Sequence, residues 1–358
     1  MTRLLELLIS VAIVAVLFLA VGLALPSSRH LSHSIETNRK PTIVFDTLNS
    51  VRRFPQWNPL VLKDPAMQLR MTGPASGKGA RIEYSSKEEG LGEGSWEIVE
   101  SEPNKRVAYR IENIERGDNK RTEFTLRPTG RNNRNVEITQ TYDVDYGMNL
   151  LGRYAGLYVS SSVGADMKMG LGRLANLLAA VPNIDYSELS KEDPARAPKV
   201  VDRPAENLLF VTSAVDRDNA KVQAQMQSNY EWIRKVMAAN GLEAAGPVRI
   251  ITNEFGAETY SFDVAQPVRK AGETGPATQY EGLKMEGPVE AAFNAPTKVA
   301  TTSYKGHMAN LSQVRDALRA WTLTNGYETI ERPYETWNGG ISAGFTPEGE
   351  FNVFWAVK

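Results

Sequence analysis

Hydrophobic positions along this chain follow three different patterns, which divide it into regions. Residues 4–25 are almost all apolar, interrupted only by Glu6 and Ser10. A helix of that length, rising about 1.5 Å per residue, covers a hydrocarbon core of about 30 Å, so residues 1–28 are predicted to form a transmembrane anchor. A cleaved secretory signal is the alternative. The apolar run is longer than such a signal needs, however, and Val21-Gly-Leu-Ala-Leu-Pro26 lacks a small-x-small cleavage pattern.

In the second region, residues 29–182, apolar and polar positions alternate over short runs, as they do in strands with one buried face. A strand over 31–37 precedes a short helix that Pro41 opens. Apolar residues at near-helical spacing from Leu150 to Val181 predict one long helix that packs across the sheet. Between these elements, five alternating runs predict an antiparallel meander: 80–85, 94–100, 106–112, 122–127 and 135–142.

The third region repeats itself. Residues 183–204 are rich in proline and charge, which predicts an extended connector to a last domain, residues 205–358. Within that domain, Tyr230–Glu243 and Arg315–Glu328 each read as an amphipathic helix stopped by Asn-Gly, and a strand follows each. We therefore expect a duplicated strand-helix-strand-strand unit with a ligand cleft at the seam between the copies. The whole chain is predicted to be α+β.

Composition excludes several function classes. The 41 basic and 42 acidic residues nearly cancel without a basic run, so nucleic-acid binding is not expected. Cysteine is absent, which removes disulfides, thiolate metal sites and thiol nucleophiles. His30 and His33 lack a third ligand, so no metal is predicted. Gly170-Leu-Gly172-Arg-Leu-Ala175 imitates a dinucleotide fingerprint but lies inside a predicted helix, so no cofactor is predicted either.

The second region resembles a known superfamily. The order strand, short helix, meander and long helix, with Phe54-Pro-Gln-Trp57-Asn-Pro59 and Gly92-Glu-Gly94-Ser-Trp96-Glu-Ile98, resembles polyketide cyclase/START-like (SRPBCC, helix-grip) proteins over about residues 32–181. The resemblance implies a sheet wrapped around the long helix, an apolar ligand cavity between them, and no universal catalytic set. Four aromatic residues either line that cavity or fill it as ordinary core, and the sequence leaves both open: Trp57, Trp96, Tyr142 and Tyr154.

The duplicated domain resembles the GyrI-like, or AraC-type effector-binding, small-molecule domain over about residues 206–358. The matching pieces are Tyr304-Lys-Gly306, Trp321 to Gly326, and Pro333-Tyr-Glu335-Thr-Trp337. The family's common Gly-Pro-Tyr is here Gly306-His307-Met308, and its Glu-x-Tyr is here Glu335-Thr-Trp337. The resemblance implies that Glu335 projects into an aromatic-lined cleft, where it binds cationic drug-like ligands or, in some members, assists hydrolysis.

The chemistry of Glu335 can also be argued without the family. A carboxylate surrounded by aromatic residues loses hydration, so it either binds a cation or gains a raised pKa suited to acid/base work. Trp337, two residues further on the same strand face, would add a π surface. Arg249 aligns with Glu335 in the repeat, so a salt bridge between them, closing the cleft, is the alternative. Further candidate ligand contacts are Tyr304, Trp321, Tyr230 and Trp355.

These patterns predict a membrane-tethered protein that binds an apolar ligand in the START-like cavity and a cationic or amphipathic ligand in the GyrI-like cleft. The alternatives are a small-molecule hydrolase or cyclase that uses Glu335, and an envelope interaction scaffold. We expect a single pass through the inner (cytoplasmic) membrane with a periplasmic body, although the charges flanking residues 4–25 do not fix the orientation. No helix-turn-helix precedes the effector-like half, so direct DNA contact is not expected.

Overall fold

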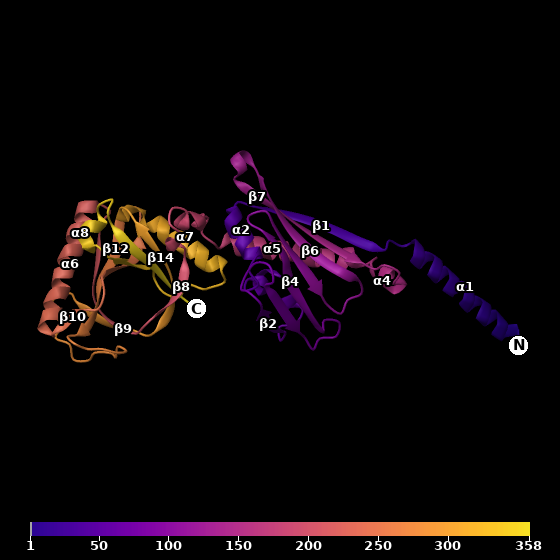
Figure 1. Ribbon diagram of the computed structural model, residues 1–358, viewed down its shortest axis with the longest axis horizontal. Coiled ribbons are helices and arrows are strands. Elements are labelled where there is room, and N and C mark those ends of the chain that lie inside the picture. Colours follow the sequence, from indigo (N-terminus) through magenta and orange to yellow (C-terminus); the bar gives the residue numbers. More distant parts are fainter. Residues whose placement is uncertain (1) are drawn as a thin grey trace. The chain divides into compact units, whose positions relative to one another are not determined.

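The computed structural model describes residues 2–358, and contacts between Cα atoms divide the chain into two compact units that meet in the sequence between Val181 and Pro182 (Figure 1). Each unit combines helices with a curled antiparallel sheet, which confirms the predicted α+β class.

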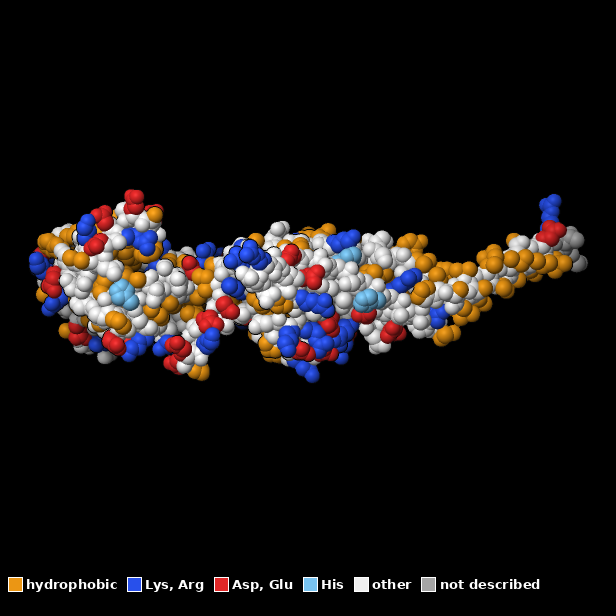
Figure 2. Space-filling model, turned by 90° about the horizontal axis from the view of Figure 1, so that it is seen from above, with side chains coloured by type: hydrophobic (Ala, Val, Ile, Leu, Met, Phe, Trp, Pro, Cys, Tyr) orange, Lys and Arg blue, Asp and Glu red, His pale blue; other side chains and the backbone are white. Residues whose placement is uncertain are grey.

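The first unit begins with an apolar helix, α1 (Thr2–Ala24). Residues Arg3–Ala24 have a mean hydropathy of 3.0, and the large hydrophobic side chains along the helix are exposed. Figure 2 shows these side chains along the length of α1. The helix is therefore long and apolar enough to cross a membrane.

A seven-stranded antiparallel sheet follows, in the order β1-β7-β6-β5-β4-β3-β2. Every alternating run predicted from the sequence coincides with one of its strands, and only the run 80–85 begins a residue too early. The edge strand β2 was not predicted, because its side chains are exposed on both faces and no alternation marks it. The strands are β1 (Ser28–Thr37), β2 (Gln68–Thr72), β3 (Arg81–Ser85), β4 (Glu93–Glu102), β5 (Arg106–Glu112), β6 (Asp118–Thr129) and β7 (Asn135–Asp145).

The helices of this unit differ from the prediction at one point. The single long helix expected from Leu150 is in fact two, α4 (Leu150–Ala155) and α5 (Val159–Ala179). Gly156 lies at the break, where a Cβ atom would come within 2.8 Å of the Tyr146 ring, so the absence of a side chain permits the close turn. The short helices before the meander are α2 (Pro41–Leu48), α3 (Phe54–Trp57) and the 3₁₀ turn η1 (Pro59–Leu62).

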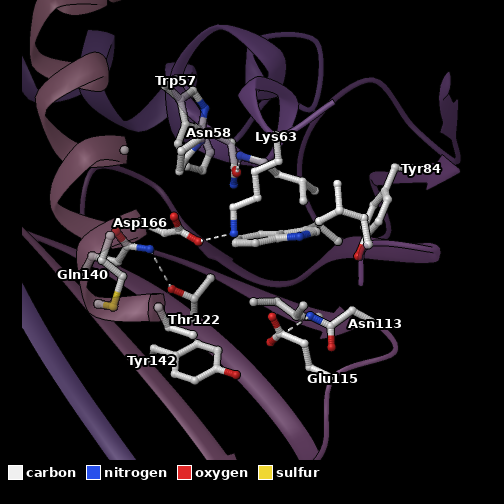
Figure 3. A pocket seen from close by; sticks show the side chains of 18 of the residues that line it. Trp57, Asn58, Lys63, Tyr84, Asn113, Glu115, Thr122, Gln140, Tyr142 and Asp166 are labelled. Atoms are coloured by element: carbon white, nitrogen blue, oxygen red, sulfur yellow. Dashed lines mark hydrogen bonds and ion pairs between the residues drawn. The ribbon is translucent and has the colours of Figure 1, made fainter. Parts of the chain in front are cut away.

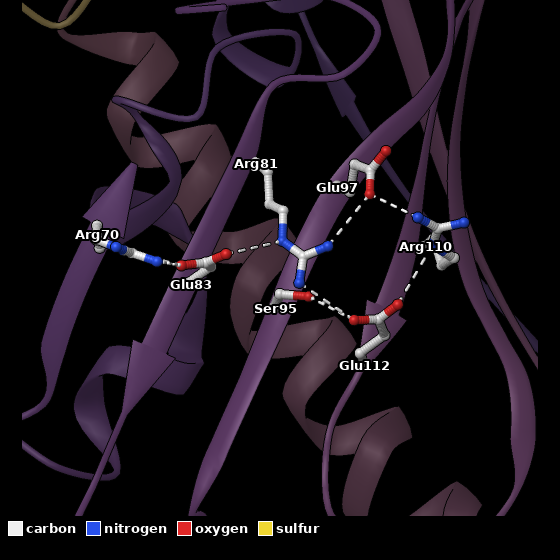
Figure 4. A network of polar contacts seen from close by, with 7 residues as sticks. All are labelled: Arg70, Arg81, Glu83, Ser95, Glu97, Arg110 and Glu112. Atoms are coloured by element: carbon white, nitrogen blue, oxygen red, sulfur yellow. Dashed lines mark hydrogen bonds and ion pairs between the residues drawn. The ribbon is translucent and has the colours of Figure 1, made fainter. Parts of the chain in front are cut away.

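The two faces of the first sheet have opposite character. The outer face carries a chain of ion pairs in which Arg81 bridges Glu83, Glu97 and Glu112 at 3.2, 3.4 and 3.2 Å (Figure 4). The network continues to Arg110, which contacts Glu97 at 2.6 Å. Such a charged face is solvated, whereas α5 and the short helices cover the other face. Any enclosed site in this unit therefore lies between α5 and the sheet.

The second unit is built on a nine-stranded sheet in the order β13-β9-β12-β11-β15-β16-β14-β8, with β10 paired to β12. Its strands are β8 (Lys199–Arg203), β9 (Glu206–Asp216), β10 (Leu242–Ala244), β11 (Val248–Phe255), β12 (Thr259–Lys270), β13 (Glu290–Asn294), β14 (Thr297–Lys305), β15 (Tyr334–Trp337) and β16 (Glu350–Val357). Its helices are α6 (Asn219–Ala239), α7 (Leu311–Thr324) and α8 (Gly340–Gly344), with 3₁₀ turns η3 (Tyr186–Ser190), η4 (Pro194–Arg196) and η5 (Met308–Asn310). The stretch predicted as an extended connector, 183–204, thus contains two turns and a strand that pairs with β14.

The duplicated pattern is visible in this sheet. One copy runs β9-α6-β11-β12 and the other β14-α7-β15-β16, and the copies join through β11 and β15, with Ile250 opposite Glu335. Buried side chains of both helices, among them Ile233 of α6 and Leu318 of α7, belong to one core cluster with Ile250. Both helices therefore pack on the same face of the sheet, the face that carries Ile250 and Glu335.

Candidate functional site

A cavity of about 90 Å³ lies between α5 and the sheet of the first unit (Figure 3). For comparison, an engineered cavity of roughly 150 Å³ holds a benzene ring. The space therefore suits a small compound or a few water molecules. Its walls come from the five strands β3 to β7, from α5 and from the α3–η1 segment, and include Trp57, Pro59, Tyr84, Trp96, Ile111, Thr122, Gln140, Tyr142, Val163, Met167 and Gly170.

The aromatic walls are held rigidly by their neighbours. Trp57 is 2% exposed and meets the rings of Phe54 and Phe124 edge-on, each at 5.4 Å between centroids. Trp96 packs edge-on against the same Phe54 at 5.2 Å. Interlocked rings of this kind leave few alternative rotamers, so the cavity is preformed.

The aromatic residues singled out in the sequence divide between two places. Trp57, Trp96 and Tyr142 line the cavity, whereas Tyr154 does not. The Tyr154 ring stacks on Phe18 of α1 at 4.6 Å between centroids, and its hydroxyl donates to the Phe18 carbonyl at 2.8 Å. The structure therefore contains both a partly filled core and a residual cavity.

A hydrogen-bonded pair of polar side chains, Gln140 and Thr122, lies in the wall of the cavity. Gln140 donates from Nε2 to Thr122 Oγ1 at 3.1 Å, and Thr122 donates in turn to the Thr141 carbonyl at 2.7 Å. The Gln140 carboxamide retains an N–H group and an acceptor oxygen for a ligand. Sequence reasoning missed this pair, although a signal existed: Thr122 and Gln140 occupy inward positions of alternating strands, where apolar residues are the rule.

Charged and phenolic groups surround the rest of the space. Lys63 Nζ lies 2.6 Å from Asp166 Oδ2. Burial, with the nearby Glu115 carboxylate, raises the pKa of Tyr84 to about 12, and the same two causes raise the pKa of Tyr142. Both phenols therefore remain protonated near neutral pH and can serve as hydrogen-bond donors. A protonated phenol cannot accept a proton as a general base.

Substituting Thr122 by valine tests the polar pair. We expect Thr122→Val to destabilise the first unit by about 1–3 kcal/mol, because it keeps the shape but leaves the Gln140 amide without its buried partner. The measurement is denaturant-dependent hydrogen exchange of β6 and β7 peptides. Thr125→Val, three residues along and half-buried on the outer face, is the control and should change stability by less than about 0.5 kcal/mol. Equal effects of the two substitutions would contradict the described pairing.

In the second unit, Glu335 lies in the helix-covered core. It is 0% exposed, and its Oε1 accepts a hydrogen bond from Arg315 Nη1 of α7 at 2.8 Å. Burial raises the pKa of Glu335, and Arg315 acts in the opposite direction. The carboxylate already has a cationic partner, so a ligand could reach it only by displacing the surrounding side chains.

The alternative partner for Glu335, Arg249, is excluded by the strand register. Arg249 stands opposite Thr336, one residue away from Glu335, so the two side chains point to opposite faces of the sheet. Arg249 instead forms a bidentate pair with Glu206 at 2.6 and 2.8 Å, and its guanidinium lies 4.2 Å from the Tyr334 ring centroid. The alternative interpretation, a Glu335–Arg249 salt bridge, is therefore wrong.

The other candidate aromatic residues do not gather in one place. Trp337 is 1% exposed and, with Tyr230, lines a hollow of about 370 Å³ beside α8. Trp355 borders an open groove of about 690 Å³ that Arg249 and Tyr334 also line. Tyr304 packs against Phe351, and Trp321 stacks on Tyr327. The groove that Trp355, Arg249 and Tyr334 line therefore lies on the opposite face of the sheet from Glu335.

Comparisons with known proteins agree with the fold of the first unit. Residues 28–179 match a family model described as polyketide cyclase / dehydrase and lipid transport. No curated protein matches the chain.

Three solved structures are similar to parts of the chain. They are the EcmrR C-terminal domain (17% identity, 45% of this chain and 96% of that chain, TM-score 0.36), truncated norcoclaurine synthase from Thalictrum flavum (12%, 42% and 94%, 0.33) and an uncharacterised conserved protein from Listeria innocua (13%, 49% and 100%, 0.34).

Proposed function

We propose that this chain is a membrane-tethered small-molecule-binding protein whose ligand occupies the cavity of the first unit. The observation that carries the proposal is the preformed space between α5 and the sheet, with aromatic walls and the Thr122–Gln140 pair. The family match over residues 28–179 supports small-molecule binding. Because the walls are largely apolar and the free polar groups are few, the ligand class is a small apolar ring that carries one or two hydrogen-bonding groups.

Tethering by α1 is part of the same proposal. Arg153 of α4, with 8% of its surface exposed, donates from Nη1 to the carbonyls of Leu23 and Leu25 at 2.9 and 3.2 Å. Removal of α1 as a signal sequence would break the hydrogen bonds of Nη1 to the Gly22 and Leu23 carbonyls and leave the guanidinium to the Gly147 carbonyl and water. This contact favours a retained anchor over a cleaved signal.

The proposed site can be tested by blocking it. Val163 lines the cavity from α5, so Val163→Phe should lower the affinity for phenol, a single small ring with one hydroxyl, at least tenfold by occupying the space. Met169→Phe, on the same helix but 50% exposed, is the matched control and should bind like the original protein. Both are measured by calorimetric titration of the full chain in lipid nanodiscs, with empty nanodiscs subtracted. Unchanged affinity in Val163→Phe would place any binding outside the cavity.

For the second unit we propose a GyrI-like small-molecule-binding module. The duplicated strand-helix-strand-strand order supports this assignment, as does the groove across the seam. The ligand would occupy the open groove beside Arg249 and Tyr334, since Glu335 is bound to Arg315. A catalytic role for Glu335 forms no part of the proposal, because the carboxylate is fully buried.

A further inference from the structure

We propose that the segment Met148–Tyr158, which contains α4, lies in the interfacial layer of a phospholipid bilayer and holds the cavity mouth against the membrane, so that the ligand enters from the lipid. The inference rests on the proposed anchorage by α1 and names the route by which the proposed site is filled. Three features of the molecule support it: the packing of α4 on α1, the apolar surface of the segment, and the position of the mouth.

The end of α1 packs closely on α4. Gly22 is buried there, and a Cβ atom on it would lie 3.2 Å from the Tyr154 ring and 3.3 Å from Leu150 Cβ. Arg153 binds carbonyl groups of the last turn, and Tyr154 binds the Phe18 carbonyl one turn earlier. If α1 spans a bilayer, these contacts place α4 at the level where the span ends.

The segment Met148–Tyr158 exposes large hydrophobic side chains, and their contact with water is unfavourable. Arg153 is its only charged residue, and its guanidinium is turned inward to backbone carbonyls. Large exposed hydrophobic residues flank α4 on both sides, adjoining the exposed side chains of α1. Tyrosine is enriched at membrane interfaces, where its ring lies among headgroups. The exposed set is Met148 (74%), Leu151 (53%), Leu157 (51%) and Tyr158 (70%).

The exposed loops of the cavity lining, between which we place its mouth, lie at the same end of the unit. Two loops, residues 86–92 and 113–117, contribute Gly90, Leu91, Ile114 and Glu115 to the lining of the cavity. Both loops connect strands at the end of the sheet where β1 starts and β7 ends, because Asp145 pairs with both Ser28 and Asp118.

Direct contacts link this mouth to α4. A Cβ atom on Gly117 would meet Val144 at 2.4 Å and the Tyr146 ring at 2.9 Å, and one on Gly152 of α4 would meet the same ring at 2.8 Å. A single buried ring, Tyr146, thus separates the mouth loop from the proposed membrane segment. Ile114 on that loop is 59% exposed and would also face the lipid.

The absence of cysteine permits a direct test with the full chain. Single cysteines at Leu17, Leu151, Leu157 and Tyr158 carry a nitroxide label in vesicles of phosphatidylcholine and phosphatidylglycerol. Control labels replace Met71 and Met169, which are equally exposed but belong to β2 and α5. Collision with oxygen measures access from lipid, and collision with a water-soluble nickel chelate measures access from water.

We expect labels at 151, 157 and 158 to collide preferentially with oxygen, as the label at 17 does, and labels at 71 and 169 to collide with the nickel chelate. Preferential nickel collisions at 151, 157 and 158, with 17 still in lipid, would overturn the inference and leave the anchorage intact. Shielding of these labels from both reagents would also overturn it, because a second copy or another protein would then cover the segment. A label at 17 exposed to water would instead overturn the anchorage itself.

The route of entry has its own measurement. Leu151→Asn/Leu157→Asn should slow the uptake of phenol from loaded vesicles at least tenfold and leave its equilibrium affinity within twofold. The control Met71→Asn/Met169→Asn should change neither quantity. Equal uptake rates in the two double variants would overturn entry from the membrane, whereas loss of binding in the original protein would overturn the proposed cavity function.

Discussion

Replacing Arg315 by methionine is expected to destabilise the second unit by about 3–5 kcal/mol at neutral pH, because it leaves a buried carboxylate without its counter-charge. Glu335 is 0% exposed, Arg315 supplies its hydrogen bond at 2.8 Å, and the second carboxylate oxygen has no partner. Methionine keeps much of the arginine stem and so preserves packing. The loss is therefore mainly electrostatic.

The loss of stability caused by Arg315→Met should depend on pH, and the burial of Glu335 determines the direction of that dependence. Burial raises the pKa of Glu335 even beside Arg315, and removing the guanidinium raises it further. A carboxyl group whose folded-state pKa is raised contributes full stability below its unfolded pKa of about 4.3 and loses it as the pH rises through the folded value. The penalty of Arg315→Met should thus be smallest near pH 4 and grow towards pH 8.

The measurement must isolate the second unit, since a chain of two units need not unfold in one step. Denaturant-dependent hydrogen exchange of peptides from β11 and β15 does so. Arg319→Met on the same helix, an exposed arginine whose guanidinium lies 5.6 Å from the Trp355 ring centroid, is the control and should cost less than about 1 kcal/mol. Arg315→Met/Glu335→Leu should recover most of the loss. An Arg315→Met loss no larger than that of Arg319→Met would refute the buried pair.

Much of the fold could be predicted because a sheet with one buried face requires apolar and polar residues to alternate along each strand. In β7, the inward positions Val136, Ile138, Tyr142 and Val144 alternate with polar outward positions, and the structure pairs this strand with β1 and β6. The repeated sequence pattern in residues 205–358 likewise predicted two helices, each followed by strands. Pairing of β11 with β15 could not be predicted, because sequence similarity between copies does not specify which edges meet.

The candidate site was less predictable, because it depends on register and on contacts distant in sequence. A register difference of one residue places Ile250 opposite Glu335 and turns Arg249 to the other face of the sheet, which excludes Arg249 as the partner of Glu335. Arg315, the observed partner, lies on a helix 20 residues from Glu335. Lys63 and Asp166, which meet beside the cavity, are 103 residues apart, and no local pattern connects them.

In the first unit, we expect the largest loss of stability from truncation of Trp57, because this residue belongs to a rigid aromatic wall with a small space behind it. Trp57→Ala should destabilise this unit by about 3–5 kcal/mol, because it removes a side chain that is 2% exposed and packs on two aromatic rings. Trp57→Phe keeps an aromatic ring and should cost about half as much. Hydrogen exchange of peptides from α3 and β6 in denaturant gives both values.

The position of Trp57 beside the cavity makes a second outcome follow from the first. Truncation at residue 57 joins the lost indole volume to the existing space of about 90 Å³, which creates a larger apolar cavity with an opening. Added indole should occupy it and restore stability by mass action, by about 2.7 kcal/mol when its concentration is a hundredfold above the dissociation constant. The original protein and Trp57→Phe should gain much less from the same addition. A Trp57→Ala protein that is destabilised but unaffected by indole would mean that the space collapses or is sealed, and ligand binding in the first unit would then lack its physical basis.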